Sequence, residues 1–166
     1  MRALVLVLFC CLPAAADDAP DLSQNQHRRS LGLGVNYLGG QVDYDFGKGK
    51  RVELLVQQGQ ESSSEGRIRS TTVGLRAMQR YRIAGVYHPY IGAQAAYVDA
   101  KVAGGAYKVT GGALGPLIGV ERSLSSRLSA GLDAGPCLFV LNERNTRTGG
   151  AQFDVVLNAF LLLRAY

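Results

Sequence analysis

From Ser30 to the end of the chain, apolar and polar residues alternate with a period of two. No stretch in this region has sustained helical spacing of its apolar residues, and turn-forming residues separate one alternating segment from the next. The pattern predicts an all-β chain of antiparallel strands. The predicted strands centre on Leu31–Leu38, Val42–Phe46, Val52–Val56, Val73–Tyr81, Ile91–Tyr97, Leu114–Val120, Leu128–Val140 and Phe153–Leu163.

The second face of these strands decides the architecture. Opposite the apolar positions stand glycine, alanine and isolated charges, as in Gly131, Asp133 and Gly135, rather than the many polar residues of a solvated surface. Small residues and a few charges suit the interior of a small barrel, which side chains fill. An apolar exterior on a closed sheet is what a bilayer requires. The sequence therefore predicts an eight-stranded antiparallel up-and-down transmembrane β-barrel over residues 30–166.

The predicted connections alternate in length. Residues 47–50, 84–86 and 123–126 are short turns, whereas residues 59–66, 101–106 and 142–150 are longer and polar. Outer-membrane barrels have short periplasmic turns, longer external loops and an even number of strands. The first hairpin has two interpretations: two strands that reverse at Gly39-Gly40, which gives eight strands, or one long bulged strand over Leu31–Phe46, which gives seven.

The first sixteen residues have the three regions of a secretory signal peptide. Met1 and Arg2 form a short positive region, Ala3–Leu12 is apolar, and Ala14 and Ala16 fit the small-residue rule for cleavage before Asp17. The apolar run is too short for a transmembrane helix. Residues 17–29 are polar and predict a flexible lead-in. The mature chain is therefore expected to be exported to the outer membrane.

A signal peptide, about eight alternating segments and a final strand ending at Tyr166 together resemble the small bacterial outer-membrane β-barrels of the OmpA/OmpX-like type. Phe160 and Leu162 precede Tyr166 at steps of two, although Arg164 and the absence of tryptophan depart from the pattern. The resemblance implies a Gram-negative cell envelope and insertion by the barrel assembly machinery. Two aromatic girdles are expected: Tyr37, Tyr97 and Phe153 at the outer interface, and Tyr44, Phe46 and Tyr81 at the inner one.

The composition excludes several classes of function. After removal of residues 1–16, Cys137 is the one remaining cysteine, so no intramolecular disulfide can form, and we expect its thiol to be buried and inert. The net charge is +5, but lysine and arginine are dispersed, which argues against binding of nucleic acid. The two histidines, His27 and His88, form neither a catalytic pair nor a metal site. No catalytic residue, metal or cofactor is predicted.

Two groups of charged residues have candidate roles. Charges inside so narrow a barrel must be paired, so we expect a salt-bridge network and no open pore. Its predicted members are Asp43, Glu53, Arg76, Arg80, Glu121, Asp133, Asp154 and Arg164, with Asp45 as a further lumen carboxylate. Cations near the predicted external ends could contact lipopolysaccharide phosphates, or could be solvated loop charges. These are Arg67, Arg69, Lys101, Lys108, Arg144 and Arg147.

The favoured function is that of a monomeric, non-enzymatic outer-membrane barrel with a structural, envelope-maintenance or surface-interaction role. Its partners would be membrane lipid and lipopolysaccharide. One alternative is a soluble periplasmic β-barrel that binds a small apolar ligand. Another is an outer-leaflet enzyme that modifies lipid, which would need a nucleophile and a base near the outer leaflet.

Overall fold

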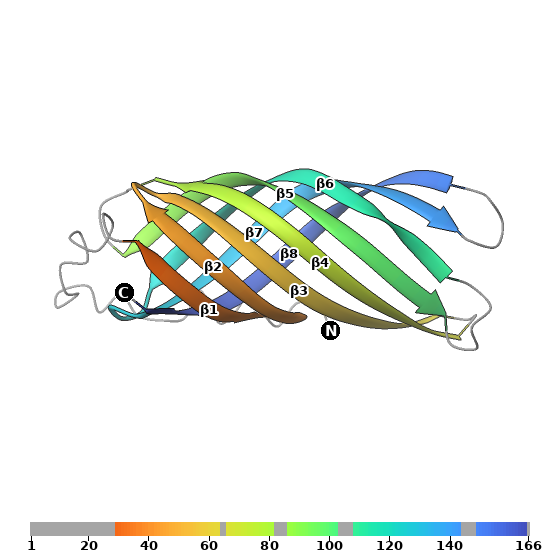
Figure 1. The fold of residues 1–166 in the computed structure, drawn as a ribbon, viewed down its shortest axis with the longest axis horizontal. Coiled ribbons are helices and arrows are strands. Elements are labelled where there is room, and N and C mark those ends of the chain that lie inside the picture. The colour runs from red at the N-terminus through yellow and green to blue at the C-terminus, as the bar shows by residue number, and fades with distance from the viewer. Residues whose placement is uncertain (1–28, 64–65, 82–85, 103–107, 144–148, 166) are drawn as a thin grey trace.

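The computed structural model describes residues 29–63, 66–81, 86–102, 108–143 and 149–165. These residues form eight strands in one closed barrel, in which each strand pairs antiparallel with its neighbours in sequence and β8 closes on β1 (Figure 1). The prediction of an all-β, eight-stranded, up-and-down barrel is confirmed. The strands are β1 (Ser30–Asn36), β2 (Gly39–Gly47), β3 (Lys50–Ser63), β4 (Gly66–Arg80), β5 (Tyr87–Val102), β6 (Lys108–Ser123), β7 (Leu128–Glu143) and β8 (Gly149–Ala165).

The pairing register fixes the tilt of the strands and the width of the barrel. Following paired residues from Leu33 through each successive strand leads to Phe153 on β8, yet Leu33 itself pairs with Leu163. The ten-residue offset between those two β8 residues is the stagger of the closed sheet. Stagger, tilt and strand number together set the diameter, and eight strands leave an interior that side chains can fill.

The two faces of the sheet have opposite character. Large apolar side chains point outward from all eight strands, and Phe153 and Leu157 are 72% and 75% exposed. The inward positions carry buried polar and charged groups: Gln41, Asp43, Asp45, Arg51, Glu53, Arg76, His88, Glu121, Ser129, Asp133, Asn158 and Arg164. The barrel is thus apolar outside and polar inside. The described residues include no helix with the length and apolarity needed to cross a membrane.

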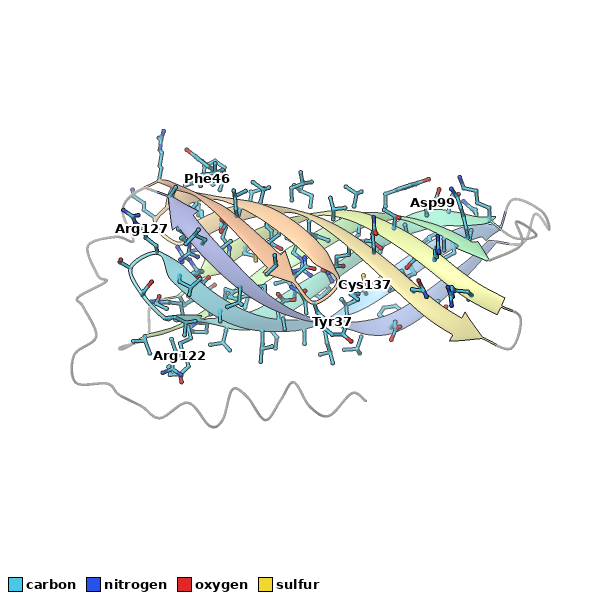
Figure 2. The ribbon with its side chains drawn as sticks, turned by 90° about the horizontal axis from the view of Figure 1, so that it is seen from below. Tyr37, Phe46, Asp99, Arg122, Arg127 and Cys137 are labelled. Atoms are coloured by element: carbon cyan, nitrogen blue, oxygen red, sulfur yellow. The ribbon has the colours of Figure 1, made fainter. Side chains whose placement is uncertain are left out.

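The two ends of the barrel differ. The terminal end holds Ser30, Ala165 and the strand ends on either side of the connections after β2, β4 and β6, and the loop end holds those on either side of the connections after β3, β5 and β7 (Figure 1). Figure 2 shows Phe46, Arg122 and Arg127 at the terminal end and Asp99 toward the loop end. All six predicted girdle aromatics are exposed, but Tyr37, predicted at the outer interface, lies near the middle of the barrel (Figure 2). Tyr44 and Phe46 pack edge to face, with ring centroids 4.8 Å apart.

The first hairpin consists of two strands, but it reverses earlier than predicted. The turn is at Tyr37–Leu38, where Asn36 Oδ1 accepts a hydrogen bond from the Leu38 amide at 3.2 Å. Gly39 and Gly40, predicted as the reversal, belong to β2. A Cβ at Gly39 would overlap the Val56 carbonyl oxygen, so glycine is needed there for close strand approach rather than for a turn.

Strands β3 to β8 extend farther toward the loop end than predicted. Residues 59–66 were expected to be a loop, but β3 continues to Ser63 and β4 begins at Gly66. We call the band of exposed apolar side chains around the outer wall the apolar belt. The polar composition of residues 59–66 reflects a stretch of sheet that lies beyond this belt, not a loop. β1 ends and β2 begins near the middle of the barrel, as the position of Tyr37 in Figure 2 shows. The turn after β2 is as predicted, with positive φ at Gly47, Lys48 and Gly49.

Two prolines interrupt the ladder between β6 and β7. The paired residues run to Leu114 and Leu138 and resume only at Ile118 and Ala134, so that Pro116 and Pro136 lie in the gap. Proline has no N–H to donate to a ladder. Each proline follows a glycine that packs closely on the opposite strand. An added Cβ at Gly135 would overlap the Pro116 carbonyl oxygen, and one at Gly115 would overlap that of Pro136.

This geometry predicts that Gly135→Ala destabilises the barrel. The added methyl group has no space beside the Pro116 carbonyl, and overpacking of this kind costs about 1–3 kcal/mol. Urea unfolding of the folded barrel, followed by circular dichroism, measures the effect. Gly112→Ala is the matched control, because its Cβ would meet nothing nearer than the Ala96 carbonyl oxygen at 3.7 Å. Equal unfolding midpoints for the two variants would contradict the prediction.

Candidate functional site

Charged and amide side chains fill the terminal-end half of the lumen. The pleat of each strand directs every second side chain inward and so places them there. Inward positions on successive strands bring acidic and basic residues from β2 to β8 into one space. We call this group of side chains the lumen network. Its members are Gln41, Asp43, Asp45, Arg51, Glu53, Arg76, Arg80, Tyr90, Glu121, Asp133, Asn158 and Arg164.

Glu121 on β6 is the most heavily paired carboxylate of the lumen network. Its Oε2 lies 2.7 Å from Arg51 Nη1, and its Oε1 lies 2.6 Å from Arg164 Nη2 and 3.8 Å from Arg80 Nη1. The Glu121 side chain is fully buried, as is that of Arg51. Withdrawing ions from water costs several kcal/mol each, which only close and well-oriented partners offset. These pairs connect β3, β4 and β8 to β6.

The carboxylates of β2 extend this group toward the terminal end. Asp45 pairs with Arg80, and its Oδ1 also accepts a hydrogen bond from the Gly47 amide at 2.8 Å. Asp43 Oδ2 lies 3.6 Å from Arg51 Nη1, and neither Asp43 oxygen has a hydrogen-bond donor among the described residues. Asp43 is therefore held by charge alone.

A second group of pairs is centred on Arg76 and Asp133. Arg76 Nη1 lies 3.3 Å from Glu53 Oε1 and 3.1 Å from Asp133 Oδ2. The Tyr90 hydroxyl and the Asn158 amide donate to the same Asp133 oxygen, at 3.0 and 3.3 Å. This group joins the wall formed by β3, β4 and β5 to the wall formed by β7 and β8.

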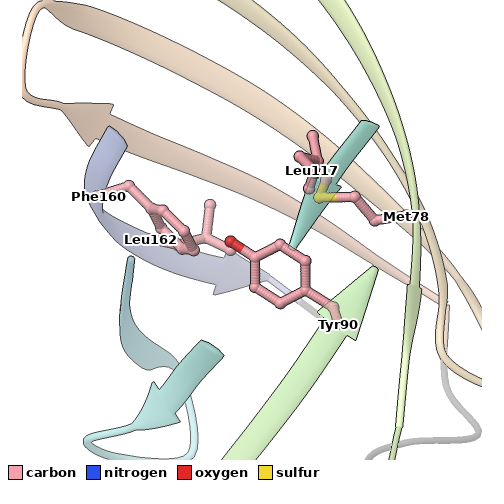
Figure 3. Close-up of a cluster of buried hydrophobic side chains, with 5 residues drawn as sticks. All are labelled: Met78, Tyr90, Leu117, Phe160 and Leu162. Carbon is pink, nitrogen blue, oxygen red and sulfur yellow. The ribbon is translucent and has the colours of Figure 1, made fainter. Parts of the chain in front are cut away.

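An apolar cluster shares the lumen with these ions. Figure 3 shows its members: Met78, Tyr90, Leu117, Phe160 and Leu162. The Arg51 guanidinium carbon lies 5.4 Å from the Tyr90 ring centroid and 5.8 Å from that of Phe160. The aromatic faces attract the cation that also pairs with Glu121. The lumen is thus occupied by large side chains at this level.

Seven of the eight predicted members of the salt-bridge network lie together, and Asp154 does not. Its position on β8 faces inward, but the side chain is exposed, and Oδ1 accepts a hydrogen bond from the Val155 amide at 2.7 Å. It forms no ion pair with a described side chain. β1 reaches β8 only as far as Phe160 and a hydrogen bond to Ala159. At Asp154 the wall has no residue of β1 on that side, which leaves the carboxylate exposed.

Sequence reasoning missed Arg51, although it pairs with two carboxylates. It stands directly after the turn at Gly47–Lys50 and was therefore not assigned to a strand. Its parity with Glu53 was the available signal, because residues two apart on a strand share a face. Tyr90 and Asn158 were missed because neutral polar residues give no charge pattern.

Three of the six predicted cations at the loop end form a row on the outer wall. Arg69 pairs in register with Lys101, and Lys101 pairs with Lys108, so the three stand side by side on β4, β5 and β6. Arg67 and Arg69 are exposed, and Lys108 Nζ lies 2.9 Å from Asp99. Like charges opposite each other repel, so a row of this kind favours an anion. Arg144 and Arg147 lie outside the described residues.

The remaining candidate residues are placed as follows. His88 was expected at a turn but lies within β5 and is buried. Cys137 faces the lumen and is 2% exposed. No group of three or more potential metal ligands occurs in the described part of the chain. Ala14, Ala16 and His27 lie outside the described residues.

By its fold, the protein belongs to the class of closed, eight-stranded antiparallel β-barrels. Its structure is similar to the crystal structure of Neisserial surface protein A (NspA), with a TM-score of 0.52 and 19% sequence identity. The match covers 81% of this chain and 92% of NspA. No protein-family model and no curated protein matches the sequence. The likeness to NspA establishes the fold.

The pairing of Glu121 predicts that Glu121→Gln strongly destabilises the barrel. The substitution leaves Arg51 and Arg164 buried without their closest carboxylate, a loss that typically costs about 3–5 kcal/mol. The urea midpoint of the folded barrel should fall accordingly. Asp154→Asn removes the same charge at an exposed position and should change the stability by less than about 0.5 kcal/mol. A Glu121→Gln barrel as stable as Asp154→Asn would show that these pairs contribute no net stability.

Proposed function

We propose that the protein is an integral outer-membrane protein that crosses the bilayer as an eight-stranded barrel. The observation that carries this proposal is the facing of the side chains, with large apolar groups outside and ionised groups inside. A bilayer admits a sheet only when it is closed, and such a sheet carries an apolar band outside. The alternative, a soluble periplasmic barrel that binds an apolar ligand, needs an apolar lumen and a polar exterior.

Within the envelope, we propose a non-enzymatic role in structure, envelope maintenance or surface interaction. The lumen network and the apolar cluster occupy the interior, which supports a barrel without an open channel. His88 and Cys137 are buried, and neither is placed to act as a base or nucleophile on a lipid at the outer leaflet. Interactions would then occur on the outer wall and at the two ends.

The biogenesis that we infer rests on the composition of residues 1–29. Residues 1–16 would direct export and be cleaved after Ala16, and residues 17–29 would remain as a periplasmic lead-in. The barrel assembly machinery would insert the mature chain as a monomer. Outer-membrane barrels have short periplasmic turns, and the connection between β2 and β3 at the terminal end is short. The terminal end would therefore face the periplasm, and the loop end would face outward.

Membrane fractionation and a detergent gel test the proposal. The protein should be recovered with the outer membrane and should migrate faster unboiled than boiled, because the closed ladder resists unfolding by detergent at room temperature. Recovery in the soluble periplasmic fraction would overturn the assignment. A Glu121→Gln variant analysed in parallel should lose the fast-migrating form at a lower temperature, which ties the mobility shift to the folded barrel.

We further propose that the row of cations at the loop end binds lipopolysaccharide phosphates. Arg69, Lys101 and Lys108 stand on neighbouring strands on the outer wall, beyond the apolar belt. Tyr97 is exposed on the same face of β5, four residues from Lys101. With the loop end outward, this row lies at the depth of the phosphorylated sugars of the outer leaflet, where guanidinium and ammonium groups form strong charge-assisted hydrogen bonds.

Replacing two members of the row tests this site. Arg69→Gln combined with Lys101→Gln should weaken binding of purified lipopolysaccharide to the folded barrel by about tenfold or more, since each cation near a charged surface contributes about 1 kcal/mol. Lys48→Gln with Lys50→Gln removes the same charge at the terminal end and serves as the control. If both double variants bind equally well, the row is solvated surface charge.

A further inference from the structure

We propose that Arg122 and Tyr87 form a binding site for the headgroup of an anionic glycerophospholipid at the terminal end of the barrel. This site deepens the proposed function, because it presumes that the barrel spans a membrane with its terminal end toward the periplasm. The ligand is the phosphodiester of a lipid in the periplasmic leaflet, which is distinct from the lipopolysaccharide proposed at the loop end.

The charges at the terminal end are segregated by sign. The carboxylates there, Asp45 and Glu121, point into the lumen, where they are buried and paired with arginines. The charges that reach the outer surface or the turns at this end, within the described residues, are all cationic. They are Arg29, Lys48, Lys50, Arg122 and Arg127. The lumen network thus takes up the described acidic groups at this end and leaves outside a basic collar that no described carboxylate neutralises.

Within that collar, Arg122 has the geometry of a site. It pairs in register with Tyr87 across β5 and β6, and its guanidinium carbon lies 5.4 Å from the Tyr87 ring centroid. The ring fixes the position of the guanidinium through a cation–π contact. Arg122 Nη1 is shielded from solvent and has no hydrogen-bond partner among the described residues. The group therefore retains an unused donor.

The site lies at the edge of the apolar belt that is nearest the terminal end of the barrel. Tyr87 is 45% exposed, and the exposed side chains of Leu124 and Leu128 stand on either side of the following turn. Arg127 occupies that turn and is also exposed (Figure 2). An aromatic ring at a membrane interface sits at the level of the headgroups. A phosphodiester there would accept hydrogen bonds from Arg122 while its acyl chains lie on the apolar belt.

The preference for an anionic lipid follows from charge. A phosphatidylcholine headgroup carries its own ammonium, which competes with the guanidinium for the phosphate. Phosphatidylglycerol has no such cation and gains the attraction of Arg122, about 1 kcal/mol for a cation near the surface, or about fivefold in relative binding.

The absence of tryptophan makes a direct test possible. A single reporter, Leu124→Trp, is placed beside the site, and a second protein carries Tyr97→Trp at the loop end. Each is folded into phosphatidylcholine vesicles containing brominated phosphatidylglycerol or brominated phosphatidylcholine, and quenching of the tryptophan measures the local ratio of the two lipids. We expect about a fivefold preference for phosphatidylglycerol at Leu124→Trp, which falls toward one when Arg122→Gln is added and is retained with Arg122→Lys.

The controls separate the site from general charge and from the proposed function. Arg67→Gln removes an equal charge at the loop end and should leave the preference at Leu124→Trp unchanged, and Arg122→Gln should not alter quenching at Tyr97→Trp. Inorganic phosphate added to the folded barrel in detergent tests whether the anion binds without acyl chains. No phosphatidylglycerol preference, or one that Arg122→Gln leaves intact, would overturn the proposal. The heat-dependent gel shift in phosphatidylcholine alone reports membrane insertion independently.

Discussion

Where all eight strands enclose it, the interior of the barrel is too narrow to keep water around a charged side chain, so an ionised group that the pleat directs inward there needs a partner within the protein. This constraint explains the arrangement around Glu121. Arg51 and Arg164 approach its two oxygens from β3 and β8, and Arg80 stands farther off on β4. Without that carboxylate, Arg51 and Arg164 would be buried without their closest partner. The same reasoning applies to Arg76 between Glu53 and Asp133.

The ion pairs also relate parts of the sheet that the backbone does not connect. Ladder hydrogen bonds join only neighbouring strands, whereas Arg51 and Glu121 join β3 to β6, and Arg76 and Asp133 join β4 to β7. A shift of one residue in any strand would turn its charges toward the exterior and its apolar residues toward the lumen. The network therefore opposes alternative registers. This matters where the ladder is interrupted, at Pro116 and Pro136, which have no N–H to hold β6 to β7.

The alternation of apolar and polar residues was sufficient to predict the strands and the direction in which their side chains face. Both depend on the local rule that successive side chains of a strand point to opposite faces. The alternation was not sufficient at three kinds of position. The boundary of a strand is set by its neighbours, and so Arg51, which directly follows the predicted turn, was not assigned to a strand. Asp154 has the right parity, but its burial depends on β1, which ends below it. Gly39 has the composition of a turn, but its place in β2 follows from close approach to β3.

Because large side chains occupy the terminal-end half of the lumen, the proposed interactions lie on the surface, and the inward pairing also affects which charges the surface carries. The described acidic residues of the terminal half pair inside the lumen, so no described carboxylate balances the cations outside, as Arg122 illustrates. At the loop end the strands rise beyond the apolar belt, and Asp99 beside Lys108 partly balances the cations. The two ends thus present different charge densities on the same sheet. A bilayer whose two leaflets differ in headgroup chemistry is the environment in which such an asymmetric barrel has one favoured orientation.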